Sequence, residues 1–121
     1  TPSAPKAIGP YSQAVKSGSL VFISGQIPLD PKTMELVGED VVRQTHQVFK
    51  NLSAIAKASG GNLVDIVKMT IYLTNLDNFS KINEIMASYF QEPYPARATI
   101  EVSALPKAAL VEVEAILALE I

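Results

Sequence analysis

The order of the predicted elements indicates an α+β domain, with a mainly antiparallel sheet and both helices packed on one of its faces. Apolar residues recur at helical spacing in two segments, 41–59 and 79–90. Short apolar or alternating stretches of strand length lie before, between and after these segments. The resulting order is two strands, a helix, a strand, a helix and two strands. A chain of 121 residues fits one domain, so we expect residues 1–121 to fold as a single unit.

The N-terminal third of the chain predicts a strand pair after an extended arm. Residues 1–10 contain three prolines and a glycine, which favour an extended arm. Residues 11–16 can form a strand that turns at 17–19, and the apolar run 20–24 is typical of a buried strand. Prolines in the following segment 28–33 place a loop there, because proline cannot donate to a strand ladder.

Capping residues support both predicted helices. Asp40 is a suitable N-cap for the first helix, and Gly60 follows it as a stop signal. Residues 75–78 supply caps for the second helix, whose polar Asn83 lies beside the apolar stripe. Such an asparagine usually bonds to a neighbouring loop, and a ligand role is the alternative. His46 lies at the edge of the first helix's apolar stripe, where we expect it to be solvated and without a catalytic role.

The segment around Arg97 carries the first indication of a site. Residues 97–103 alternate, which predicts a strand with Arg97 and Thr99 on one side and Ala98 and Ile100 on the other. A guanidinium group presents a planar fork of donors that binds a carboxylate or phosphate through two parallel hydrogen bonds. The alternative is a surface arginine paired with a nearby glutamate.

The composition favours self-association and argues against several classes of function. Hydrophobic residues make up 48% of the chain and charged residues 18%, so we expect a homo-oligomer. The apolar face of the last strand, 110–119, adds to this expectation, because two helices cover only one side of a sheet. That face comprises Val111, Val113, Ala115, Leu117 and Leu119.

The chain has no cysteine and one histidine, so we expect no disulfide, thiolate chemistry, metal site or cofactor. The net charge of −2 and the scattered lysines argue against nucleic-acid binding. No apolar run approaches the roughly 20 residues of a membrane span, and the start lacks a signal-peptide pattern. We therefore expect a cytoplasmic protein without membrane or nucleic-acid partners.

The last two predicted strands are expected to form a hairpin through the turn at 104–109. Pairing Glu101 with Glu112 would bring two like charges together, so the favoured register sets Thr99 opposite Glu112 and Arg97 opposite Glu114. Arg97 and Glu112 then become diagonal neighbours with Thr99 between them. One reading is a cross-strand ion pair. The other is a site in which one of the two carboxylates is left to hold a water.

Eight segments in order along nearly the whole chain resemble the reactive intermediate deaminase family, the RidA or YjgF-like imine and enamine deaminases. Together they form a specific signal, whereas each alone would be weak. The segments are 7–14 (AIGPYSQA), 22–28 (FISGQIP), 30–33 (DPKT), 65–68 (DIVK), 76–79 (LDNF), 95–97 (PAR), 105–107 (LPK) and 111–116 (VEVEAI).

The resemblance implies a chorismate-mutase-like α+β fold and a homotrimer with clefts between subunits. Carried onto this sequence, it implies that Arg97 clamps the substrate carboxylate and Glu112 positions the water. It further implies substrate contacts from the residues Tyr11, Ser24, Gly25 and Asn83. The family often has cysteine where this chain has Thr99, so that position can only act as a polar group. The stretch before Pro95 is shorter than in typical bacterial members, which alters the rim of the cleft.

The implied activity is hydrolysis of 2-aminoacrylate and 2-iminobutanoate-like acids to 2-keto acids and ammonia, as part of metabolite damage control. An imine carbon is already electrophilic, so the site needs only to orient the substrate and a water. In this scheme Thr99 and the Gly25 backbone contact the imine nitrogen. One alternative is a module that binds small acids without turnover. Another is a ribonuclease or translation inhibitor, which the acidic net charge disfavours.

Overall fold

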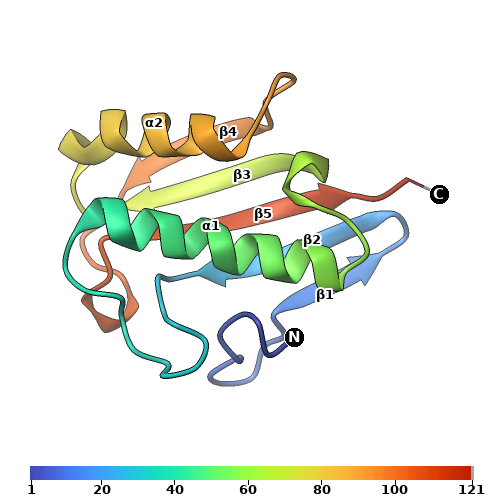
Figure 1. The fold of residues 1–121 in the computed structure, drawn as a ribbon, viewed down its shortest axis with the longest axis horizontal. Helices are drawn as coiled ribbons and strands as arrows, with labels where there is room; N and C mark the ends of the chain where they lie inside the picture. Colours follow the sequence, from blue (N-terminus) through green and yellow to red (C-terminus); the bar gives the residue numbers. More distant parts are fainter. Residues whose placement is uncertain (121) are drawn as a thin grey trace.

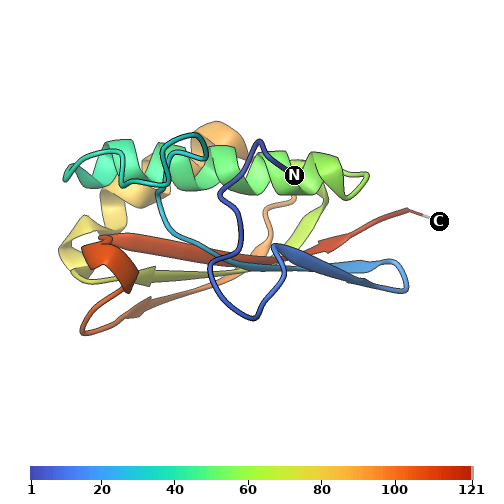
Figure 2. The same ribbon diagram turned by 90° about the horizontal axis from the view of Figure 1, so that it is seen from below.

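A computed structural model describes residues 1–120, which form a five-stranded sheet covered on one face by two helices (Figures 1 and 2). This confirms the predicted fold class and the order of the elements. The elements are β1 (Ala14–Ser17), β2 (Leu20–Gln26), α1 (Val41–Ala58), β3 (Ile66–Leu73), α2 (Phe79–Tyr89), β4 (Ala96–Glu101) and β5 (Val111–Ala118), with short 3₁₀ turns at Leu63–Asp65, Leu76–Asn78 and Pro106–Ala108.

The strand order across the sheet is β1-β2-β5-β3-β4. Every neighbouring pair is antiparallel except β3 and β4, which run parallel. The chain between them forms α2, as a parallel pair requires a long crossover connection. The last strand, β5, therefore inserts into the middle of the sheet between β2 and β3.

The predicted hairpin of the last two strands is wrong. The strand β4 pairs only with β3, placing Arg97 beside Met69 and Thr99 beside Ile71. Glu112 lies opposite Tyr72, and Glu114 lies opposite Thr70.

Burial of the apolar side chains of β5 explains why this strand does not pair with β4. In the central position both edges of β5 are hydrogen-bonded, and its apolar side chains lie in the core, which an edge hairpin could not offer. The connection after β4 is also too long for a tight turn, and it contains a 3₁₀ turn with two residues of positive φ, Lys107 and Ala108.

The core lies between the sheet and the helices. Phe49 and Leu52 of α1 pack with Met69 of β3 and Val113 of β5, all essentially without exposed surface. Asp40 caps α1 as predicted, since its Oδ1 accepts a hydrogen bond from the Val42 amide at 3.2 Å. The helix also ends before Gly60, as predicted.

Two buried polar side chains of α1 fix the loops that lead into the sheet. Gln44 donates from Nε2 to the Gly38 carbonyl at 2.7 Å and accepts from the Leu110 amide at 2.8 Å. Asn51 donates from Nδ2 to the Leu29 carbonyl at 3.0 Å. Because Leu110 directly precedes β5, the Gln44 bond anchors the start of that strand beneath the helix.

The face of β5 that was expected to need a partner is already covered. Its odd-numbered residues from Val111 to Leu117 are buried under the helices. The uncovered side of the sheet presents other apolar side chains instead, including Phe22 and Ile100, each 44% exposed. Its polar residues include Tyr72, Glu112 and Glu114, which come from β3 and β5.

His46 is half-buried rather than solvated, which corrects the expectation from the sequence. Its Nδ1 lies 2.8 Å from the Tyr89 hydroxyl at the end of α2. The close packing of the two helices produces this contact, and the sequence period of α1 alone does not reveal it. Within residues 1–120, neither helix has the length and apolar character needed to cross a membrane.

Candidate functional site

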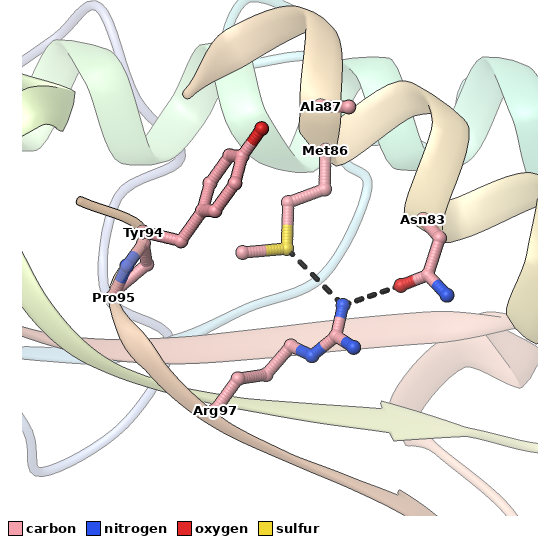
Figure 3. A pocket seen from close by; sticks show the side chains of 6 residues that line it. All are labelled: Asn83, Met86, Ala87, Tyr94, Pro95 and Arg97. Atoms are coloured by element: carbon pink, nitrogen blue, oxygen red, sulfur yellow. Dashed lines mark hydrogen bonds between the residues drawn. The ribbon is translucent and has the colours of Figure 1, made fainter. Parts of the chain in front are cut away.

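Arg97 extends from β4 toward α2 and is held there by uncharged partners (Figure 3). Its Nη1 donates to Oδ1 of Asn83 and lies 3.4 Å from Sδ of Met86. The guanidinium carbon lies 5.2 Å from the centre of the Phe79 ring, in cation–π range. These contacts orient the guanidinium without matching its charge, so the group is suited to bind an anion. Among residues 1–120 the side-chain hydrogen-bond partners of Arg97 are uncharged, unlike the glutamate partner of the alternative prediction.

The guanidinium borders an open hollow of about 430 Å³ between α2 and the segment leading into β4. Figure 3 shows the Tyr94 ring, the Met86 thioether and the Arg97 side chain around this space. One side of the hollow is therefore cationic and another is apolar. The lining residues are Asn83, Met86, Ala87, Tyr94, Pro95 and Arg97.

Glu112 lies in the middle of the sheet, close to the backbone of β2. A methyl group built onto Gly25 would lie 3.0 Å from Glu112 Cδ and closer still to its Oε2, so only glycine leaves room for this carboxylate. Gly25 belongs to an irregular stretch of β2, since the register with β5 shifts between Ile23 and Gln26. Such bulges often re-aim side chains next to active sites.

Burial raises the pKa of the Glu112 carboxyl above its usual value, and the neighbouring charge of Glu114 raises it further. The carboxyl is therefore a stronger base than an ordinary surface glutamate. On the adjacent strand, the Tyr72 hydroxyl donates a hydrogen bond to Glu114 Oε1. This bond to Glu114, followed by burial, raises the pKa of Tyr72.

Ser24 and Tyr11, two of the predicted substrate contacts, lie near Gly25. The Ser24 hydroxyl donates to the Ser12 carbonyl at 2.6 Å, and the Ser24 amide donates to the Gln13 carbonyl at 3.0 Å. Tyr11 is half exposed and lines a small hollow together with Gly25. The hydroxyl of Tyr11 accepts a hydrogen bond from the Ile8 amide at 3.2 Å.

The predicted residues therefore fall into two groups. Arg97 and Asn83 form one group, which we call the arginine half; it lies at the β4 edge on the side covered by α2. Glu112, Gly25, Ser24 and Tyr11 form the other, which we call the glutamate half. Its Glu112 lies on the uncovered side of the sheet.

The prediction that Arg97 and Glu112 are diagonal neighbours in one chain is wrong. The strand β3 separates their strands, and the alternation of side chains places the two on opposite faces.

Thr99 does not lie between Arg97 and Glu112 as predicted. It sits on the covered side of β4, where its Oγ1 exposes less than 1 Å² and has no hydrogen-bond partner among the described residues. A buried hydroxyl without a partner is uncommon. Within one chain this hydroxyl does not line the hollow beside Arg97.

Three residues of these two regions were missed from the sequence. Met86 was assigned to the apolar stripe of its helix, although its sulfur contacts Arg97. Tyr94 directly precedes the Pro95-Ala96-Arg97 motif, and that adjacency was a usable signal. Tyr72 has no local signal, because its contact with Glu114 depends on β5 pairing with β3.

The arginine half and the glutamate half define a small α+β protein with an arginine held by uncharged partners at one sheet edge and a half-buried carboxylate at the sheet centre. The family model described as Endoribonuclease L-PSP matches residues 1–119. The chain belongs to this family, the YjgF/RidA family, which confirms the resemblance seen in the sequence.

Individual relatives agree over nearly the full length. A RutC family protein of Pyrococcus horikoshii is 54% identical, over 96% of this chain and 92% of the relative. A protein of Dermatophagoides farinae named 2-iminobutanoate/2-iminopropanoate deaminase is 45% identical, over 99% of this chain and 94% of the relative. The crystal structure of RidA from an Antarctic Psychrobacter matches with a TM-score of 0.95 and 51% identity, covering 98% of this chain and 96% of that one.

Proposed function

We propose that this protein hydrolyses 2-imino acids and their enamine tautomers, such as 2-iminobutanoate and 2-aminoacrylate, to 2-keto acids and ammonia. The observation that carries the proposal is Arg97, a guanidinium oriented by an amide oxygen and an aromatic ring at the edge of an open hollow. All these substrates carry a carboxylate next to the reacting carbon. The deaminase name of the 45% identical relative supports the same activity.

The two half-sites also support a site shared between subunits. Arg97 and Glu112 cannot meet within one chain, because they occupy opposite faces and non-adjacent strands. We propose a homotrimer in which the arginine half of one subunit faces the glutamate half of its neighbour. The exposed apolar side chains on the uncovered sheet face, among them Val15, Phe22 and Ile100, favour such an association.

In the proposed reaction, Arg97 binds the substrate carboxylate through paired hydrogen bonds, and Asn83 fixes the orientation of the guanidinium. Glu112 of the facing subunit orients a water and accepts its proton as the oxygen attacks the imine carbon. The C=N bond becomes a C–N single bond. The nitrogen takes the proton that Glu112 removed from the water, which gives a carbinolamine. The carbinolamine hydroxyl then loses its proton to Glu112, which passes it to the nitrogen as the C–N bond breaks, and the keto acid and ammonia are released.

The Gly25 backbone borders the Glu112 carboxylate, which supports a contact with the substrate near the imine nitrogen in the proposed reaction. Tyr11 forms an exposed wall beside it. The proposed reaction includes no contact between Thr99 and the substrate, because the Thr99 hydroxyl is buried within one chain.

A coupled assay tests the activity. Serine and a pyridoxal-phosphate dehydratase generate 2-aminoacrylate, and the purified protein should accelerate formation of pyruvate beyond the spontaneous rate. Pyruvate that forms at the spontaneous rate, while the protein still binds a keto acid, would favour the alternative of a small-acid binding module without turnover. The family description names an endoribonuclease, so RNA cleavage is measured in parallel; the net charge of −2 leads us to expect none.

Subunit mixing tests the shared site. Arg97→Lys and Glu112→Gln proteins are each expected to be nearly inactive. After equal amounts are unfolded and refolded together, one site in each mixed trimer, or about a quarter of all sites in the sample, would combine an intact arginine with an intact glutamate. Recovery of activity to that level supports a site between subunits. Persistent inactivity, with mixed trimers verified by mass spectrometry, would contradict it.

A further inference from the structure

The uncovered sheet face contains a second carboxylate that the proposed reaction does not use. Glu114 lies two residues after Glu112 on β5, so both side chains project from the same face of the sheet. Two carboxylates on one strand face repel each other, and nothing in the packing of β5 requires a charge at position 114. The contacts of Glu114 show what retains it there.

Tyr72 lies directly opposite Glu112 across the β3–β5 ladder, yet its hydroxyl donates to Glu114, the diagonal neighbour. The bond ties the end of the Glu114 side chain to β3. Because the bond spans two strands, it also restricts where the Glu114 carboxylate can lie relative to Glu112.

Besides burial, the carboxylate of Glu114 is the group on this face that raises the pKa of Glu112. From β2, Gly25 contributes only backbone beside the Glu112 carboxylate. From β4, the residues beside Thr70 and Tyr72 are Ala98 and Ile100. Lys68 of β3 borders the same hollow as Glu114, opposite Ile116, and is therefore the cation on this face closest in register. Tyr11 approaches from the segment before β1, on the Gly25 side.

We propose that Tyr72 and Glu114 form a positioning pair, which holds a second negative charge beside the Glu112 carboxylate and so keeps Glu112 a strong base for the water. Tyr72 fixes the position of the Glu114 carboxylate through its hydrogen bond. Glu114 in turn opposes ionisation of Glu112, since two neighbouring carboxylates resist becoming charged together. Neither residue needs to touch the substrate. This inference rests on the proposed role of Glu112.

Direct titration of Glu112 tests the pair independently of turnover. Protein labelled with ¹³C at the glutamate carboxyl carbon is followed by NMR from pH 3 to 9, and the Glu112 signal is assigned by its loss in Glu112→Gln. In Glu114→Gln the Glu112 midpoint should move to lower pH. In Tyr72→Phe it should move the same way by less. The double variant should match Glu114→Gln alone, because Tyr72 acts only through Glu114.

The controls match the chemistry of each change. Glu39→Gln removes an exposed carboxylate at the entry to α1, and Tyr89→Phe removes a phenol in the helical layer. Neither should move the Glu112 midpoint. A Glu112 signal that titrates identically in the wild type and in folded Glu114→Gln would overturn the proposal. So would a Tyr72→Phe effect that adds fully to that of Glu114→Gln.

The pH dependence of kcat/KM connects the pair to the reaction. Activity requires ionised Glu112, so the acidic limb should move to lower pH in Glu114→Gln, while the plateau falls several-fold because the base is weaker. If the protein does not hydrolyse imines at all, the proposed function fails but the NMR titration still decides whether the pair acts on Glu112. If Glu114→Gln hydrolyses imines and neither the acidic limb of kcat/KM nor the Glu112 titration midpoint moves, the proposed function stands and only the positioning role of Tyr72 and Glu114 is disproved.

Discussion

The two halves of the proposed site hold their charges in different ways. The arginine half lies at the edge of the sheet, where Asn83 and the Phe79 ring orient the guanidinium group. The glutamate half lies at the sheet centre, where burial and Glu114 alter how readily Glu112 ionises. In the proposed site, the arginine half fixes the orientation of the bound carboxylate, and the glutamate half sets the basicity of Glu112. Binding should therefore depend mainly on geometry at Arg97, and catalysis mainly on the surroundings of Glu112.

The largest effect is expected for Glu112→Gln. Glutamine keeps the size and can still hold a water, but it cannot accept a proton. Turnover should fall by roughly 10²–10⁴-fold, the usual contribution of general acid–base catalysis. Keto acid affinity, measured by calorimetry, should survive because Arg97 is intact. A collapse of affinity with an unchanged rate per bound substrate would show that Glu112 serves only as a counter-ion.

Arg97→Lys should affect the other half. Lysine keeps the positive charge but lacks the planar fork of donors, so it cannot hold the substrate carboxylate through two parallel hydrogen bonds. We expect turnover to fall by about 10²-fold or more, because even a small misplacement of an oriented substrate slows a reaction by this amount. Here keto acid affinity should weaken as well, unlike in Glu112→Gln. Circular dichroism and thermal melting serve as the folding control, and near wild-type activity in a folded variant would make Arg97 structural.

Gly25→Ala probes the glutamate half without changing any charged group. Gly25 does not have positive φ, so alanine fits its backbone, but the new methyl group would occupy the space of the Glu112 carboxylate. The end of the Glu112 side chain can move aside, so the melting temperature should change little. Turnover should fall by about 10-fold, less than for removal of the base. Gly18→Ala, which meets open space in a turn at positive φ, is a control that should lower stability rather than rate.

The smallest effect concerns stability. The raised pKa means that folded protein keeps the Glu112 proton at pH values where the unfolded chain has lost it. The stability gained from neutral Glu112 is therefore present below the unfolded pKa and is lost as pH rises through the folded pKa. Glu112→Gln cannot lose a proton, so its melting temperature should exceed that of the wild type modestly at pH 7. The difference should shrink toward pH 4, and a difference independent of pH would contradict this origin.

Local patterns in the sequence were sufficient for much of the fold. The 3.6-residue period from Val41 to Ser59, with Asp40 before it and Gly60 after it, located α1 because these signals act within one helix. The alternation after Pro95 located β4 in the same way. The motifs around Gly25, Arg97 and Glu112 indicated the family, and the match over residues 1–119 confirmed it.

The tertiary structure alone decided how the strands pair and which faces their residues share. The sequence gives each strand its alternation but not its neighbours, so a hairpin of β4 and β5 was locally reasonable and nevertheless wrong. Burial of Val111, Val113 and Leu117 favours the central position for β5, and this energy comes from contacts with segments distant in the chain. That position places Tyr72 against Glu114 and separates Arg97 from Glu112. Pairing between distant strands is a property of the whole packed core, which is why no local pattern contained it.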